Sequence, residues 1–112
     1  MDSSGDKDIF KRLEEHLRKY PLQFVYLYGS FAEGNRGRLS DIDLAVCFSP
    51  ELSKPERFDL RLRLSSKLSG ICGRAVDVIS LNDASLSLAF EIIKKGTVLF
   101  CTDRNALVEK EY

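Results

Sequence analysis

The sequence predicts a small α/β (α+β) domain in which helices cover a small mixed β-sheet. First, 112 residues with a hydrophobic content of 44% suit a single domain with one modest core. Second, four short apolar runs are typical of strands. Third, segments between these runs carry apolar residues at helical spacing. We therefore expect one domain over residues 1–112, without an internal repeat or an interdomain linker.

The chain opens with a predicted flexible tail over residues 1–6 and a predicted helix over residues 7–20. Pro21 ends this helix because proline cannot continue it. Residues 24–28 are β-branched and aromatic, which predicts the first strand. The apolar residues at helical spacing are Ile9, Phe10, Leu13, Leu17 and Tyr20.

A segment punctuated by glycines separates the first strand from the second. We expect a short helix over residues 30–33, ended by Gly34, and then a polar loop over residues 35–40. Residues 42–48 predict the second strand. After its aspartates this run is almost continuously apolar, as in a strand covered on both faces.

An amphipathic helix is predicted over residues 54–69, closed by Gly70. This prediction is based on apolar residues four positions apart, namely Phe58 with Leu62, and Leu60 with Leu64 and Leu68.

The last third of the chain predicts two strands and two helices. Residues 74–80 form the third strand, and Asn82 or Asp83 is the expected cap of a helix that runs to Lys95. Gly96 follows the last turn of this helix. The remaining elements are a strand over 97–101 and a short terminal helix over 103–112.

Composition disfavours several classes of protein. Lys+Arg and Asp+Glu are both 17, so the net charge is zero and direct binding to nucleic acid is disfavoured. No apolar run approaches the roughly 20 residues that span a bilayer, so we expect no membrane contact and a cytoplasmic location.

The cysteines and the histidine are also informative. Cys47, Cys72 and Cys101 are widely spaced and contain no Cys-x-x-Cys pair, so we expect reduced structural thiols and no zinc ribbon. His16 is the single histidine, and its place among charged residues of the first helix predicts a solvated position. Mechanisms of the Ser-His-Asp or Cys-His kind are therefore disfavoured.

Two carboxylates stand together where the second strand begins. Asp41 and Asp43 point the same way because strand side chains alternate between faces. Such a pair repels unless a cation lies between, and oxygen ligands suit Mg²⁺ or Mn²⁺. Upstream, Gly29 allows a sharp turn, and Ser30 can open a helix whose N–H groups attract phosphate. Together these features indicate nucleotide chemistry.

Asp77 stands inside the otherwise apolar third strand, where we expect it to be buried. A buried carboxylate is costly unless it is paired or binds a metal. One interpretation is an ion pair with Arg74 or with an arginine from a helix. The other places Asp77 beside Asp41 and Asp43 in a triad that holds two metals for in-line displacement at a phosphate. One acid could then take the proton of the attacking hydroxyl.

Gly29-Ser30, ten further residues and Asp41-Ile42-Asp43 resemble the Gly-Ser-x(10)-Asp-x-Asp signature of the polymerase-beta-like nucleotidyltransferase superfamily. The string Ser40-Asp-Ile-Asp-Leu44 is similar to its minimal branch, abbreviated MNT. The resemblance implies the polymerase-beta-like fold. It implies that Gly29 and Ser30 bind the β- and γ-phosphates of a nucleoside triphosphate. Asp41 and Asp43 would then hold Mg²⁺, and Asp77 would be the third metal-site acid and assist the acceptor hydroxyl.

The resemblance also implies a function. Small prokaryotic members are typically encoded beside a HEPN-domain protein, and some transfer AMP from ATP to a tyrosine of that toxin. We therefore expect an Mg²⁺-dependent protein adenylyltransferase that acts as the antitoxin of a HEPN-type partner. Arg36 and Arg38 could contact triphosphate, an acidic surface of the partner, or solvent. Tyr26 and Tyr28 are expected to be packing residues.

Two alternatives remain open. The chain could be a non-catalytic antitoxin or nucleotide-binding module that neutralises its partner by binding alone. An aminoglycoside-type transferase acting on a small molecule is disfavoured, because we expect no second domain to bind the drug.

Overall fold

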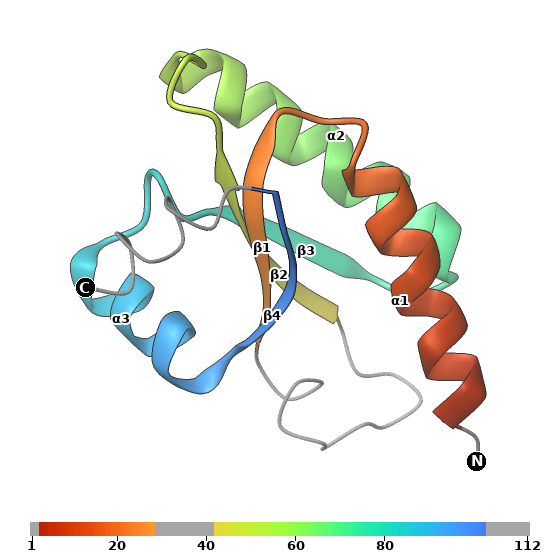
Figure 1. The fold of residues 1–112 in the computed structure, drawn as a ribbon. Helices are drawn as coiled ribbons and strands as arrows, with labels where there is room; N and C mark the ends of the chain where they lie inside the picture. The colour runs from red at the N-terminus through yellow and green to blue at the C-terminus, as the bar shows by residue number, and fades with distance from the viewer. Residues whose placement is uncertain (1–2, 29–41, 103–112) are drawn as a thin grey trace.

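A computed structural model of the chain describes residues 3–28 and 42–102 (Figure 1). The predicted α+β class is confirmed. Within the described ranges the elements are α1 (Ser3–Leu17), β1 (Leu22–Tyr28), β2 (Ile42–Phe48), α2 (Lys54–Cys72), β3 (Val76–Ser80), α3 (Leu86–Lys95) and β4 (Thr97–Cys101). The predicted helices over 30–33 and 103–112, and the loop over 35–40, lie outside the described residues.

The sheet is mixed and has the strand order β3-β2-β1-β4. β1 is antiparallel to both β2 and β4, whereas β2 and β3 are parallel. Helices α1 and α2 cover one face of this sheet, and α3 lies against the other (Figure 1). None of the helices in the described ranges is long and apolar enough to cross a membrane.

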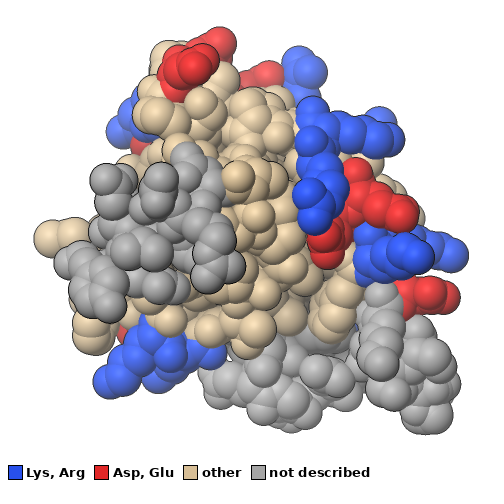
Figure 2. All heavy atoms as spheres, in the orientation of Figure 1, with Lys and Arg blue, Asp and Glu red and all other residues tan. Residues whose placement is uncertain are grey.

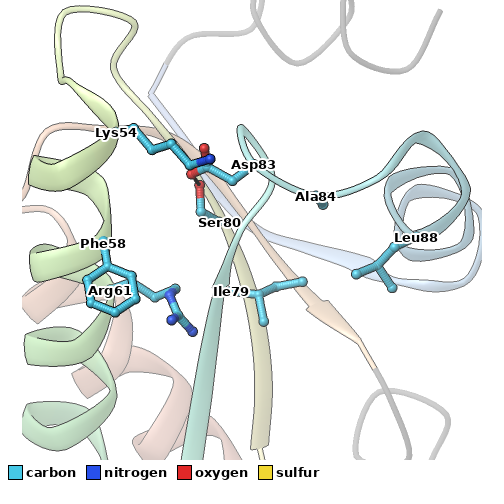
Figure 3. A pocket seen from close by; sticks show the side chains of 8 residues that line it. All are labelled: Lys54, Phe58, Arg61, Ile79, Ser80, Asp83, Ala84 and Leu88. Carbon is cyan, nitrogen blue, oxygen red and sulfur yellow. Dashed lines mark hydrogen bonds between the residues drawn. The ribbon is translucent and has the colours of Figure 1, made fainter.

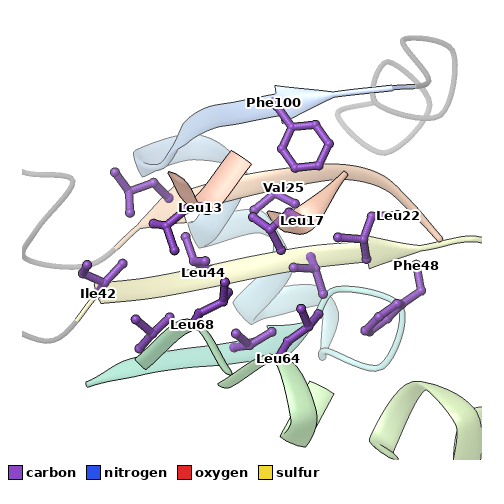
Figure 4. Close-up of a cluster of buried hydrophobic side chains, with 14 residues drawn as sticks. Leu13, Leu17, Leu22, Val25, Ile42, Leu44, Phe48, Leu64, Leu68 and Phe100 are labelled. Atoms are coloured by element: carbon purple, nitrogen blue, oxygen red, sulfur yellow. The ribbon is translucent and has the colours of Figure 1, made fainter. Parts of the chain in front are cut away.

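Strand side chains alternate between two hydrophobic cores. The larger core joins α1 and α2 to one face of the sheet, and its labelled side chains meet in Figure 4. The smaller core lies under α3 and takes Phe24, Tyr26, Ala45 and Cys47 from the sheet. The surface is mixed in charge, and Figure 2 shows acidic and basic side chains interspersed on the side of α1.

Helix α2 also protects the outer edge of β3. Ser69 Oγ accepts a hydrogen bond from the Val76 N–H at 2.9 Å, and Ser65 Oγ accepts one from the Val78 N–H at 3.0 Å. Unpaired N–H groups on an edge strand cost free energy and invite pairing with another chain. The two serines, one helical turn apart, therefore satisfy this edge from within the domain.

The ends of the first two helices differ from the prediction. Helix α1 begins at Ser3 rather than at residue 7, because a glycine inside a helix costs only about 1 kcal/mol and Gly5 does not stop it. Helix α2 ends at Cys72, and its cap is Gly73 rather than Gly70. Gly73 adopts the left-handed conformation (φ 70°), and its N–H donates to the Ser69 carbonyl at 3.0 Å.

The predicted apolar face of α2 is only half right. Leu64 and Leu68 are buried and Leu60 packs against the same core, but Phe58 and Leu62 are 56% and 48% exposed. Successive helical residues are rotated by about 100°, so positions two apart point in nearly opposite directions. Phe58 and Leu62 therefore cannot face the core that contains Leu60 and Leu64.

The cap of α3 also differs from the prediction. Ser85 Oγ accepts from the Leu88 N–H at 3.1 Å, so Ser85 is the cap. Asn82 instead binds both backbone groups of Phe48, and Asp83 pairs with Arg57.

Gly96 follows α3 as predicted, but it is needed for a close approach rather than for a left-handed turn. A Cβ atom there would lie 2.6 Å from the Ile92 carbonyl oxygen and 2.9 Å from that of Leu27. Any larger residue would therefore push α3 away from β1.

We predict that Ser65→Ala lowers the free energy of unfolding by about 1 to 3 kcal/mol, because it leaves the buried Val78 N–H without an acceptor. Urea unfolding measures the change. Ser66→Ala, at an exposed position of the same helix, is the matched control and should not destabilise the protein. Equal stability of the two variants would show that the hydroxyl does not protect the edge of β3.

Candidate active site

The structure brings Asp43 and Asp77 together on neighbouring strands. They are directly paired in the parallel register of β2 and β3, so both side chains leave the same face of the sheet. Adjacent strands are about 4.8 Å apart, which places two like charges side by side. This pair is the centre of the candidate site.

Asp77 is exposed rather than buried, which corrects the prediction. β3 is an edge strand, and Asp77 is not among the side chains that pack in the core under α3, so water solvates this carboxylate. Of the ion pairs between described residues, none includes Asp77. The predicted pairing of Asp77 with Arg74 is therefore not found among the described residues.

Tyr28 completes the site on the other side of Asp43. The two residues are paired in the antiparallel register of β1 and β2. Burial raises the pKa of the Tyr28 phenol to about 12, and the negative charges of Asp43 and Asp77 add to this effect. Tyr28 is thus half-buried beside the acids as a neutral hydroxyl. The packing role predicted for it is incomplete, because cross-strand register cannot be read from one strand alone.

Among the described elements, helix α3 covers this face of the sheet only in part. Along β1 the residues on the α3 side are Phe24, Tyr26 and Tyr28, and only the first two are fully buried. Along β2, Ala45 and Cys47 are covered whereas Asp43 is partly exposed. Helix α3 therefore leaves uncovered the row of side chains where the chain leaves β1 and enters β2.

The remaining predicted site residues are Gly29, Ser30, Arg36, Arg38 and Asp41, which lie outside the described residues. The segment that carries them joins the sheet at Tyr28 and Ile42, at the end that holds the two acids (Figure 1).

The described carboxylates suit a hard divalent cation. Asp43 and Asp77 supply oxygen donors from adjacent strand positions, the ligand type that Mg²⁺ prefers. Residues 3–28 and 42–102 contain no group of three or more His, Cys, Asp or Glu side chains that could hold a metal. A complete oxygen shell therefore needs ligands beyond this pair, such as water, a phosphate or the Asp41 carboxylate.

Comparisons with known proteins agree with this geometry. A family model described as polymerase beta, nucleotidyltransferase matches residues 11–105. The protein adenylyltransferase MntA of Shewanella oneidensis is 32% identical over 105 residues, which cover 94% of this chain and 71% of that relative.

Two solved structures resemble the fold closely. One is a toxin–antitoxin complex with AMP-PNP, with a TM-score of 0.73 and 30% identity over 88% of this chain and 78% of that chain. The other is a tri-AMPylated Shewanella oneidensis HEPN toxin in complex with an MNT antitoxin. Its TM-score is 0.70, with 25% identity over 94% of this chain and 79% of that chain.

We predict that the free energy of unfolding decreases less at alkaline pH in Tyr28→Phe than in the wild type. The phenol has an ordinary pKa of 10.0 when unfolded and about 12 when folded. As the pH rises above 10 the unfolded chain loses this proton first, so the wild type loses stability between pH 10 and 12. Urea unfolding at pH 8, 10 and 11 should show a shallower decline for Tyr28→Phe.

The control is Tyr20→Phe, which removes a hydroxyl between α1 and β1, outside the candidate site, and leaves Tyr28 in place. Parallel declines for Tyr28→Phe and the wild type would contradict the placement of Tyr28 beside the acids.

Proposed function

Because the chain belongs to the polymerase beta nucleotidyltransferase family, we propose that it is a protein adenylyltransferase that uses ATP and Mg²⁺. Its acceptor is a tyrosine hydroxyl of a HEPN-type toxin, and this transfer makes the chain the antitoxin of that partner. The observation that carries the proposal is the pairing of Asp43 with the exposed Asp77 across β2 and β3.

The three acids would bind the metal ion at the reacting phosphate. Asp41, Asp43 and Asp77 would hold Mg²⁺, which when bound neutralises charge on the phosphate oxygens. Gly29 and Ser30 bind the β- and γ-phosphates through backbone N–H groups. The arginines of the same segment, Arg36 and Arg38, compensate the charge of the triphosphate.

The transfer is a single displacement at the α-phosphorus of ATP. The tyrosine oxygen of the acceptor forms a bond to this phosphorus, the bond to the bridging oxygen breaks, and pyrophosphate leaves. Asp77 takes the proton of the acceptor hydroxyl, since it is the acid on the exposed edge strand. Tyr28 stays protonated at neutral pH and adds no further negative charge.

The relatives support the choice of donor and acceptor. The Shewanella relative is a protein adenylyltransferase, one solved complex contains AMP-PNP, and another contains an AMPylated HEPN toxin. We propose the same partner class for this chain. A cytoplasmic location goes with the proposal, because the odd number and wide spacing of Cys47, Cys72 and Cys101 suit structural thiols in a reducing compartment.

We predict that Asp43→Asn and Asp77→Asn each lower the rate of AMP transfer by about two orders of magnitude or more. Charge neutralisation at the phosphate is worth several kcal/mol, and about 1.4 kcal/mol is a tenfold change in rate. The assay is transfer of label from α-³²P-ATP to the product of the adjacent gene in the presence of Mg²⁺.

Asp59→Asn, at an exposed position of α2, is the control and should keep the activity of the wild type. Absence of label with the wild-type chain would refute the adenylyltransferase. If the Asp43→Asn chain still neutralised the toxin fully in cells, the non-catalytic antitoxin would be the better description.

We predict that Mg²⁺ stabilises the wild-type fold and that this effect depends on Asp43. Added Mg²⁺ should raise the Tm of the wild type and leave that of Asp43→Asn nearly unchanged. Differential scanning calorimetry with and without Mg²⁺ measures both effects, and Asp59→Asn should respond to Mg²⁺ like the wild type.

A further inference from the structure

A groove lies between α2 and α3 and has the end of β3 as its floor (Figure 3). Its volume is about 250 Å³. Phe58 and Arg61 approach it from α2, Leu88 approaches it from α3, and Ile79 of β3 lies between them (Figure 3). No sequence motif indicates this groove, because its residues are distant in the sequence.

Large apolar side chains are exposed at this groove. Phe58 is 56% exposed and Leu88 is 43% exposed, and Leu62 lies one turn after Phe58 on the same side of α2. Phe58 and Leu62 follow the helical spacing of a core helix, yet neither reaches the core. Exposed apolar side chains gathered at a concave surface, with polar groups around them, are typical of sites that bind another protein.

The charge of the groove is positive. Asp83, the carboxylate in its lining, is held by Arg57 through bonds of 2.6 and 2.9 Å, and these bonds lower the pKa of Asp83 to about 2. Its charge is therefore compensated. Lys54 and Arg61 also line the groove, and the structure gives neither of them a carboxylate in an ion pair within the described residues.

Arg61 is already oriented by the protein. Its guanidinium carbon lies 5.3 Å from the centre of the Phe58 ring, and Nη1 is 3.4 Å from the Val78 carbonyl oxygen. Because the Arg61 side chain is already held above an exposed aromatic ring, it loses less conformational entropy when a carboxylate binds to it.

The groove continues into the candidate active site. Ile79 lies two residues after Asp77 on β3, and strand residues two apart point to the same face about 7 Å from each other. A segment that lies over Ile79 is therefore next to Asp77, the acid that would receive the acceptor's proton.

We propose that this groove binds the segment of the partner protein that flanks the acceptor hydroxyl. The segment carries an apolar side chain that packs against Phe58, Ile79 and Leu88. It also carries one or more carboxylates that pair with Lys54 and Arg61. Binding there positions the acceptor hydroxyl at Asp77, so the groove determines which partner is modified. This inference rests on the proposed adenylyl transfer.

The kinetic test uses the full chain and the protein encoded beside it. Phe58→Ala and Arg61→Glu should each raise the KM for the partner about tenfold, with kcat at saturating partner within about twofold of the wild type. The matched controls are Phe90→Ala, at a 66% exposed residue of α3, and Arg63→Glu, at an exposed arginine of α2. Both controls should keep the KM of the wild type, and circular dichroism checks that all four variants fold.

The results separate this inference from the proposed function. No transfer by the wild type would refute the adenylyltransferase itself. Transfer by the wild type with an unchanged KM in Phe58→Ala and Arg61→Glu would refute only the groove. A KM that rises equally in the two controls would also overturn it, because the effect would then not be local.

A crosslinking experiment identifies the occupant. p-Benzoylphenylalanine at position 58 should crosslink to the partner, in a segment that contains the acceptor and an acidic residue. The same probe at position 90 should give little crosslink. Crosslinks from position 58 to a second copy of this chain, to its own terminal residues, or to a partner segment without acidic residues would each overturn the assignment.

Discussion

The alternation of side chains along β2 and β3 is the constraint on which the rest of the structure depends. The parallel register of β2 and β3 places the two carboxylates at directly paired positions. A slip of one residue would turn Asp77 toward the face that α1 and α2 cover, where a charge would be buried. The register of β3 is therefore set by the alternation of its side chains, which turns Val76 and Val78 toward the core and Asp77 to the opposite face.

Helix α2 contributes to this register from outside the sheet. Leu64 and Leu68 pack on the core face, while Ser65 and Ser69 accept hydrogen bonds from the free edge of β3. The strand that carries Asp77 is thus held by backbone pairing on one side and by hydroxyl groups on the other. A site on an edge strand needs such support, because it has only one neighbouring strand.

The two faces of the sheet differ in how much of their length the helices cover. One is covered by α1 and α2 and provides most of the buried apolar surface. The other is covered by α3 over part of its length, which leaves both the acid end and the floor of the groove accessible. The main core and the candidate site therefore lie on opposite faces of the sheet.

The sequence by itself determined the class of the fold, the positions of its strands and the acids that meet at the site. These features depend on local patterns, namely apolar periodicity and the spacing from Gly29-Ser30 to Asp41 and Asp43. Tertiary structure decided the exposure of Asp77, the outward direction of Phe58, and the place of Tyr28 beside the acids. It also decided that Gly73 rather than Gly70 caps α2, and that Ser85 caps α3. Such features depend on which element covers which face of the sheet. They cannot be read from local patterns, because the burial and contacts of a side chain are set by neighbours that are distant in the sequence.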